Sequence, residues 1–596
     1  MRLKKETITR IFPLIIAATG LILYANSLDG KFIWDDETLV RLNTYTRSFA
    51  NLPKVFTQDI GHGSGTRLGF YRPIQIMTYT IDYLFYGIKE RGYHLTNVFL
   101  HILTAICVYW LSNVLYKKRW ASLIAAMLFL AHPLHTATVS YISGRADSLV
   151  NLFILLGVIF YVKDTDKPSV LSCTAIFISY TLALFSKEGA LIFPALLVLY
   201  HCSFMKKIRP ARFLPVVAIT LGYILIRLTA LKHLLVPSPE TICGSTTILD
   251  RLPGSFAAIT AYAQTLIMPV DIHMGHGMYL FRPGDPRAIS GLLIFAAMIA
   301  AAYHFRRAAS RNLIFFGIMW FIIAILPVSN IYPLNSYMAE HWLALPSVGL
   351  FLIIGNSIVK KEGDDLRGVS PFLVIVVSAA IAFYGYITIW QNNCWSKPLR
   401  LYNRILQYEP RNVNVLVELA RQYEAMNRPE EAIKLYTRAV EINPKFAIPY
   451  NNLGLIYHKM GKDDIAIKYY EKSIELDPDF SIALNNLAGA YRLRGRTAEA
   501  IGMYEKAIKA NPNFAGAYSN LGLVYGSMGD YGKALEALKK AVEISSDHPQ
   551  ANYNIAVLYY NMRQYDLAVK HCDKAASLGW KCDKNFLDKI ESVRSR

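Results

Sequence analysis

Residues 450–478 read YNNLGLIYHKMGKDDIAIKYYEKSIELDP, and this stretch returns in outline along the C-terminal part of the chain. Proline recurs every 34 residues, at Pro410, Pro444, Pro478 and Pro512. Between the prolines, a Leu-Gly or Leu-Ala pair is followed by tyrosine, alanine and usually a second tyrosine. The small residues allow two helices to approach closely, while the leucines and tyrosines fill the space between them. The pattern therefore predicts a stack of helix pairs.

A 34-residue period with this spacing is typical of tetratricopeptide repeats. We predict five repeats and a capping helix, at 413–446, 447–480, 481–514, 515–548, 549–582 and 583–596. Such arrays bind extended peptides or protein surfaces in a groove. Asparagine recurs at the sixth place of successive repeats, on the helix that lines the groove: Asn452, Asn486, Asn520 and Asn554. These amides could hold a peptide backbone, because each offers a donor and an acceptor. Asparagine is, however, also common at this place in such repeats.

The chain up to residue 392 is a series of apolar runs separated by short polar loops, and we expect a multi-pass helix bundle. A membrane-crossing helix needs about 20 mostly apolar residues. We predict eleven spans, at 10–28, 96–115, 119–135, 146–163, 169–185, 189–205, 212–230, 289–305, 312–328, 340–359 and 369–390. A weaker run at 253–270 is excluded, because crossing there would place later basic clusters outside. The predicted fold is all-α, with a linker at 393–412 between bundle and repeats.

The net charge of +20 is distributed as in a membrane protein, because Lys and Arg gather in loops on one side of the predicted spans. We therefore expect a cytoplasmic N-terminus, an uncleaved signal anchor and no nucleic-acid partner. An odd number of spans places the repeats outside, on the same face as the first outer loop at 29–95. Short loops with few insertions favour a prokaryotic cell membrane.

Five polar stretches fall on the outer side of this arrangement: WDDE at 34–37, GFYRPIQ at 69–75, HPLHTATVSYISGRADS at 132–148, SKEGA at 186–190 and NSYMAEHW at 335–342. Ionisable residues at membrane depth are costly and usually mark a functional site. A solvated loop explains any one stretch, but it does not readily explain all five on one face.

In their order, these stretches and GYHLTNVFLH, followed by the repeats, resemble the transmembrane and tetratricopeptide-repeat-containing proteins. Those proteins belong to the C-type-fold integral-membrane glycosyltransferases. The resemblance implies a polyprenyl-phosphate sugar donor and an acidic residue in the first outer loop. The animal branch of the family is associated with protein O-mannosylation. In one departure, His341 stands where the resemblance would lead us to expect arginine.

The expected reaction can be matched to residue types. The acceptor hydroxyl must lose its proton, so Asp35 or Asp36 is the candidate general base. Neighbouring acids raise each other's pKa, which keeps one of them ready to accept a proton. The leaving phosphate needs cations or hydrogen-bond donors, and the candidates are Arg72, His132, His135, Arg145 and Lys187. Supporting partners are Asp147, Glu188, Glu340 and His341. Local ion pairing of Arg145 with Asp147, and of Lys187 with Glu188, which would only hold the loops, is an equal alternative.

These features predict a glycosyltransferase that moves mannose or another hexose onto a protein Ser or Thr hydroxyl, with the repeats recruiting the acceptor. We assign no metal, since no zinc spacing is present and a pair of carboxylates would hold a divalent ion only with help from the donor phosphate. Cys572 and Cys582 are close enough in sequence to bridge, although nothing requires it. Two alternatives stay open: a transferase acting on a glycan or lipid, and a non-catalytic membrane scaffold.

Overall fold

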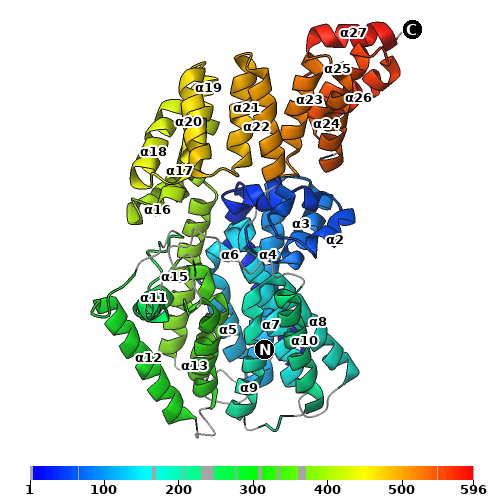
Figure 1. The fold of residues 1–596 in the computed structure, drawn as a ribbon. Helices are drawn as coiled ribbons and strands as arrows, with labels where there is room; N and C mark the ends of the chain where they lie inside the picture. Colours follow the sequence, from blue (N-terminus) through cyan, green and yellow to red (C-terminus); the bar gives the residue numbers. More distant parts are fainter. Residues whose placement is uncertain are drawn as a thin grey trace. The chain divides into compact units, whose positions relative to one another are not determined.

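The computed structural model describes a chain built from helices and loops. The described residues are 5–64, 66, 68–163, 169–204, 206–208, 210–229, 247–274, 277, 280–306, 312–331, 334, 336–359, 371–545 and 548–594. No strand occurs among them, so the predicted all-α class is confirmed. The chain forms two compact units (Figure 1). The first contains Met1–Arg41, Tyr45–Ile60 and Leu68–Pro410, and the second contains Leu42–Thr44, Gly61–Arg67 and Arg411–Arg596.

The first unit is a bundle of long apolar helices with shorter helices in its loops. The long helices are α1 (Lys5–Tyr24), α4 (Glu90–Tyr116), α5 (Arg119–Ala131), α7 (Arg145–Lys163), α8 (Val170–Ser186), α9 (Phe193–Phe204), α10 (Pro210–Leu228), α11 (Ile248–Ile267), α12 (Pro286–Phe305), α13 (Asn312–Ile325), α14 (Ala344–Ile358) and α15 (Pro371–Trp395). The helices outside these apolar ones are α2 (Leu52–Val55), α3 (Pro73–Tyr86), α6 (Thr136–Ser140) and α16 (Pro398–Tyr408).

Six helical segments of the described chain are long and apolar enough to cross a membrane, which makes this a membrane protein. A seventh candidate is α5 with the segment Pro133–Ser140, a pair bent by 51°. Three of the predicted spans correspond to shorter apolar helices, Val170–Ser186, Glu188–Phe204 and Asn312–Val328, and another to α10. Each predicted span thus overlaps a helix, although parts of 189–205, 212–230 and 369–390 lie outside the described residues. The total of eleven spans stays a prediction.

Small residues let neighbouring helices of the bundle touch. A Cβ added to Gly317 on α13 would lie 2.4 Å from the carbonyl oxygen of Gly349 on α14. A Cβ added to Gly349 would likewise lie 2.3 Å from the carbonyl oxygen of Gly317. Close backbone approach of this kind is how helices pack in a lipid environment, where burial of apolar surface gives little driving force. Pairs of small residues therefore fix the spacing of α13 and α14.

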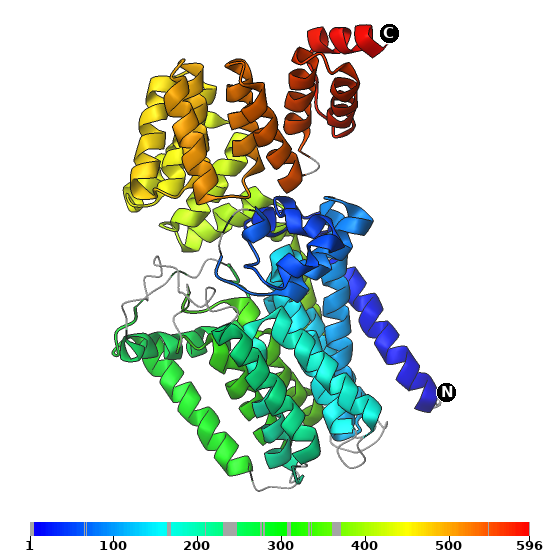
Figure 2. The same ribbon diagram turned by 45° about the vertical axis from the view of Figure 1, so that its right-hand side comes forward.

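The second unit contains one helix pair for each predicted repeat, as Figure 2 shows. The pairs are α17 (Val413–Ala425) with α18 (Pro429–Ile442), α19 (Ala447–Lys459) with α20 (Asp463–Leu476), α21 (Ser481–Leu493) with α22 (Thr497–Ala510), α23 (Ala515–Ser527) with α24 (Tyr531–Ile544), and α25 (Pro549–Asn561) with α26 (Tyr565–Ser577). Helix α27 (Lys584–Arg594) follows. A Cβ at Gly454 would lie 2.7 Å from the Tyr470 ring, which explains the glycine and the tyrosine of the repeat pattern.

Candidate active site

The WDDE segment forms a tight turn that separates the two aspartates. Trp34 has a φ of 47°, in the left-handed region, which is rare for a bulky side chain and is found mostly where function requires it. The backbone N–H of Asp36 donates to the Ile33 carbonyl at 2.9 Å, and that of Glu37 donates to the Trp34 carbonyl at 3.2 Å. The turn leaves Asp35 exposed and Asp36 completely buried.

Asp36 is held by protein donors on both carboxylate oxygens. Its Oδ1 accepts hydrogen bonds from the backbone N–H of Ser143 at 2.8 Å and from the Ser143 hydroxyl at 2.5 Å. Its Oδ2 accepts from the Ile33 N–H at 3.2 Å. Burial raises the pKa of Asp36 to about 7, although the hydrogen bonds oppose the shift. Asp36 therefore fastens the loop to the 3-10 turn η7 (Ile142–Gly144).

Asp35 keeps an accessible carboxylate in a polar setting. Its backbone N–H donates to the Tyr141 hydroxyl oxygen at 3.3 Å, which places this hydroxyl beside the Asp35 carboxylate. Arg72 lies within electrostatic range. Neighbouring protein atoms remove part of the water around the Asp35 carboxylate, which raises its pKa, and Tyr141 and Arg72 oppose this shift. An accessible carboxylate with a raised pKa is suited to accept a proton near neutral pH.

Two ion pairs lie close to Asp35. The Arg72 guanidinium, at the start of α3, contacts both Glu188 carboxylate oxygens, at 2.9 Å from Nη2 and 3.4 Å from Nε. Lys187 Nζ lies 2.6 Å from Asp147 Oδ1. Only 14% of the Arg72 side chain and 14% of the Lys187 side chain are exposed. Arg72 also interacts with Asp147 and Asp35, so the structure gathers these five predicted site residues.

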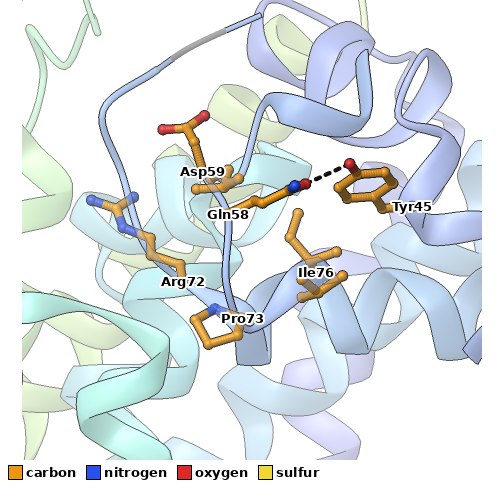
Figure 3. Close-up of a pocket in the computed structure, with 8 residues that line it drawn as sticks. Tyr45, Gln58, Asp59, Arg72, Pro73 and Ile76 are labelled. Carbon is orange, nitrogen blue, oxygen red and sulfur yellow. Dashed lines mark hydrogen bonds between the residues drawn. The ribbon is translucent and has the colours of Figure 1, made fainter. Parts of the chain in front are cut away.

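Arg72 and Asp59 line the same small pocket between the loop after α2 and the start of α3 (Figure 3). Asp59 lines the pocket and accepts hydrogen bonds from the backbone N–H groups of Leu68 at 3.0 Å and Phe70 at 2.9 Å. The Arg72 guanidinium lies over the Phe70 ring, 4.5 Å from its centre. Asp59 thus holds the segment that leads to Arg72. Sequence reasoning missed Asp59, because a single aspartate in a long loop gives no signal.

The AEHW stretch contributes through His341. The 3-10 turn η11 (Glu340–Leu343) places His341 within electrostatic range of Asp147, Lys187 and Arg72. Glu340 is buried, and its Oε1 accepts from the His273 backbone N–H at 3.0 Å. His341 therefore joins the cluster, whereas Glu340 fixes the loop that contains His273.

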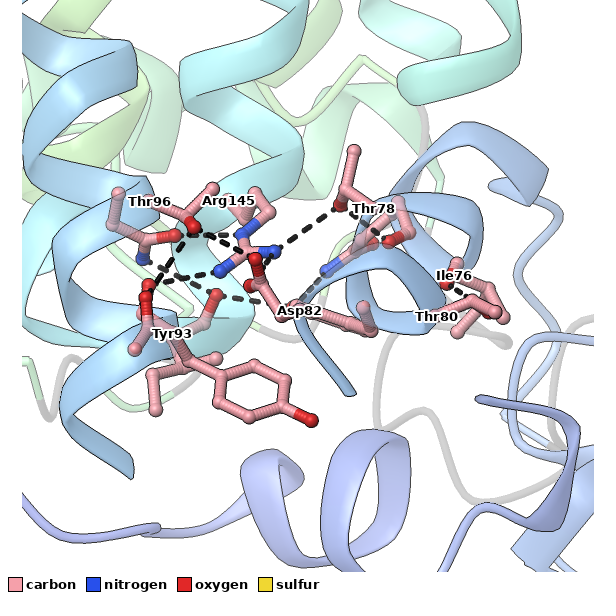
Figure 4. Close-up of polar contacts among 12 residues, drawn as sticks. Ile76, Thr78, Thr80, Asp82, Tyr93, Thr96 and Arg145 are labelled. Atoms are coloured by element: carbon pink, nitrogen blue, oxygen red, sulfur yellow. Dashed lines mark hydrogen bonds and ion pairs between the residues drawn. The ribbon is translucent and has the colours of Figure 1, made fainter. Parts of the chain in front are cut away.

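Arg145 lies elsewhere, and the expectation that it binds the donor phosphate is not supported by its geometry. It is completely buried and forms a 2.6 Å ion pair with Asp82 (Figure 4). Its Nε donates to Asn97 Oδ1 at 2.7 Å, and its Nη2 donates to the Tyr93 carbonyl at 2.9 Å. The partner is Asp82 rather than Asp147, so this guanidinium joins α3, α4 and α7 inside the protein.

His132 and His135 are also buried, at the bend between α5 and α6. His132 Nδ1 accepts from the Leu134 backbone N–H at 3.2 Å. The His135 ring packs against Phe129, with 4.1 Å between the ring centres. Among the described residues, both histidines contact the interior of the bundle. Their geometry therefore does not support a role in phosphate binding.

The asparagine ladder of the second unit connects successive repeats. Asn486 Nδ2 donates to Asn451 Oδ1, and Asn520 Nδ2 donates to Asn485 Oδ1, both at 3.0 Å. Asn554 Nδ2 donates to the Ser519 hydroxyl at 3.3 Å. Asn452 Nδ2 donates to the Tyr436 hydroxyl at 3.2 Å. The amides are therefore partly used to join the repeats, while Asn486, Asn520 and Asn554 stay partly exposed.

Different family models match parts of the two units. Residues 64–237 match the dolichyl-phosphate-mannose-protein mannosyltransferase model. Tetratricopeptide-repeat models match residues 420–461, 445–513, 479–547 and 527–577. The second unit is therefore a tetratricopeptide-repeat array.

Several curated protein O-mannosyl-transferases are similar to this chain. Protein O-mannosyl-transferase F38B6.6 of Caenorhabditis elegans is 24% identical over 68% of this chain and 59% of its own length. Protein O-mannosyl-transferase TMTC1 of Homo sapiens is 24% identical over 70% of this chain and 54% of its own length. Protein O-mannosyl-transferase tmtc2 of Xenopus laevis is 35% identical over 26% of this chain and 19% of its own length. The chain thus spans little more than half of the first two relatives, and its resemblance to the transmembrane and tetratricopeptide-repeat-containing proteins is confirmed.

Proposed function

We propose that this protein is a membrane glycosyltransferase that moves a hexose such as mannose from a polyprenyl-phosphate donor to a Ser or Thr hydroxyl of a protein. The observation that carries the proposal is the accessible Asp35 carboxylate beside the shielded cations Arg72 and Lys187. The names of the relatives and the match to the mannosyltransferase model support the same reaction class.

In the proposed reaction, the acceptor oxygen attacks the anomeric carbon of the sugar and its proton passes to Asp35. The bond between the anomeric carbon and the phosphate oxygen breaks, and the electron pair leaves with the lipid phosphate. Arg72 and Lys187 stabilise the charge that grows on this phosphate. Glu188 and Asp147 hold the two cations in place before the donor binds, which reduces the reorganisation needed during transfer.

The repeats supply the acceptor-binding surface in this proposal. The partly exposed amides of Asn486, Asn520 and Asn554 can bond to a peptide backbone without selecting its side chains. Transfer takes place on the outer face of a prokaryotic cell membrane, with the N-terminus in the cytoplasm. The charge distribution of the loops supports this orientation.

The test uses membranes that contain the full-length protein and radiolabelled polyprenyl-phosphate mannose. Wild type is compared with Asp35→Asn and with Glu37→Gln, which neutralises another acid of the same loop that pairs with Arg41 at 3.1 Å. We expect label in protein for wild type and Glu37→Gln, and none above background for Asp35→Asn. Label in a glycan or lipid fraction would show that the acceptor is a glycan or a lipid rather than a protein. No transfer from this donor or from a panel of other lipid-linked sugars would favour the scaffold alternative.

A further inference from the structure

The Tyr141 side chain is fixed by aromatic packing on two sides. It is 6% exposed, and its ring stacks on that of Trp395, with 5.8 Å between the ring centres. The Trp34 ring meets it edge-on at 6.4 Å and also contacts Tyr402 of α16 at 5.4 Å. A ring held in this way has little freedom to rotate, so its hydroxyl points in one direction.

The backbone around Tyr141 is fixed as well. Asn97 Nδ2 donates to the carbonyl oxygens of Tyr141 at 3.1 Å and Val139 at 3.2 Å. Two residues further on, Ser143 holds Asp36 through its N–H and its hydroxyl. Residues 141–143 therefore form hydrogen bonds with both aspartates of the turn. Ser143 bonds to the buried Asp36, and Tyr141 bonds to the exposed Asp35.

The geometry points to Tyr141 as a positioning residue for the proposed base: we propose that its hydroxyl holds the Asp35 carboxylate in place and favours its ionised form. This inference rests on the proposed function for the role of Asp35, but the contact itself can be tested without any substrate. The Tyr141 oxygen accepts from the Asp35 N–H at 3.3 Å, which leaves its O–H free to donate and places it beside the carboxylate. In the proposed arrangement the first bond fixes the backbone of Asp35 and the donated O–H fixes its side chain.

Hydrogen bonding to a carboxylate favours its charged form. The charged and titratable groups that face Asp35 are Tyr141, Arg72 and Asp36. Tyr141 and Arg72 lower the pKa of Asp35, whereas burial raises it. In Tyr141→Phe the ring packing remains, but the hydroxyl that accepts from the Asp35 N–H and donates to the carboxylate is gone, so the pKa of Asp35 rises. A purely structural role for Tyr141 would not produce this shift.

The experiment measures protonation of Asp35 directly. A carbodiimide with an amine modifies protonated carboxyl groups, and mass spectrometry of the purified full-length protein follows modification of Asp35 against pH. We expect the midpoint to lie at higher pH in Tyr141→Phe than in wild type. Tyr180→Phe is the matched control, because its hydroxyl bonds with Thr220 at 2.8 Å and not with the site. Equal midpoints in wild type, Tyr141→Phe and Tyr180→Phe would overturn the inference.

A second measurement connects this contact to turnover. Sugar transfer by Tyr141→Phe should fall about tenfold at the wild-type optimum, the usual effect of losing one hydrogen bond to a charged group. The acid limb of its pH profile should move to higher pH, while that of Tyr180→Phe stays in place. If wild type transfers no sugar, the proposed function fails, but the carbodiimide midpoints still decide the inference about Tyr141.

Discussion

Arg145 and Arg72 each pair with a carboxylate in the first unit, yet their surroundings differ. Arg145 is completely buried, and Asp82, Asn97 and Tyr93 engage its donors. Arg72 is shielded but open on one side, and its partner Glu188 is 44% exposed in its side chain. A buried pair costs desolvation and stabilises only as a complete unit, whereas a partly open pair can exchange its carboxylate for a phosphate. Burial of the partner carboxylate, rather than the ion pair itself, separates the buried Arg145 from Arg72, the proposed phosphate-binding arginine.

The largest expected effect is on the buried pair. Arg145→Met leaves the Asp82 carboxylate buried without its partner, which should cost about 3–5 kcal/mol and strongly reduce the yield of folded protein. The double variant Arg145→Met with Asp82→Leu removes both charges and should recover most of this loss. Thermal unfolding in detergent measures both variants. If Arg145→Met is as stable as wild type, Arg145 is not the structural arginine that the contrast with Arg72 requires.

Arg72→Ala should act on turnover instead. The loss of one cation from the phosphate site should lower sugar transfer by about 100-fold to 1,000-fold, with little change in the unfolding temperature. Arg72→Lys retains the charge but not the two-point contact with Glu188, and should lie between wild type and Arg72→Ala. Initial rates at saturating donor measure this series. Unfolding of Arg72→Ala with the severity of Arg145→Met would contradict the distinction between the two arginines.

The two neighbouring aspartates extend the same contrast. In Asp36→Asn the amide NH₂ faces the N–H of Ile33 or Ser143, so two donors meet and one hydrogen bond is lost. The substitution should therefore destabilise the protein by about 1–3 kcal/mol. Burial raises the pKa of Asp36 in the folded state from 3.8 to about 7. Between these values the unfolded state releases a proton that the folded state keeps, so wild-type stability should fall as pH rises through this window. The unfolding temperature of Asp36→Asn should fall less steeply with pH in this window than that of wild type. Parallel curves of unfolding temperature against pH for the two proteins would refute this.

The smallest effect concerns the side of the membrane on which the repeats lie. Cys572 Sγ and Cys582 Sγ are 3.9 Å apart, and both are reduced thiols in the structure. In an oxidising outer compartment this pair should form a disulfide. In intact cells, an impermeant maleimide should label the pair only after an impermeant phosphine reductant, with the Cys572→Ser and Cys582→Ser double variant as control. Labelling that requires permeabilised cells would place the repeats inside.

The sequence predicted the repeats closely, because a fixed period of small and aromatic residues determines both helix pairing and helix ends. It also led us to expect that Asp147 and Glu188 orient the cations Arg72 and Lys187, since ionisable residues at membrane depth usually mark a functional site, and the structure pairs these four residues. The sequence could not distinguish the role of Arg145 from that of Arg72. Asp82, the partner of Arg145, lies on another helix, and only the packing of α3 against α4 and α7 brings Asp82 and Arg145 together. The same limit applied to His132, His135 and Asp59.

The most direct test of the central claim is the initial rate of sugar transfer by Asp35→Asn, normalised to folded protein and compared with Asp36→Asn. Removal of a general base should lower the rate of Asp35→Asn by about 100-fold or more while its unfolding temperature stays near that of wild type. Asp36→Asn should lose stability but retain transfer per folded molecule. If Asp35→Asn transfers sugar at the wild-type rate, Asp35 is not the base, and the proposed mechanism is wrong.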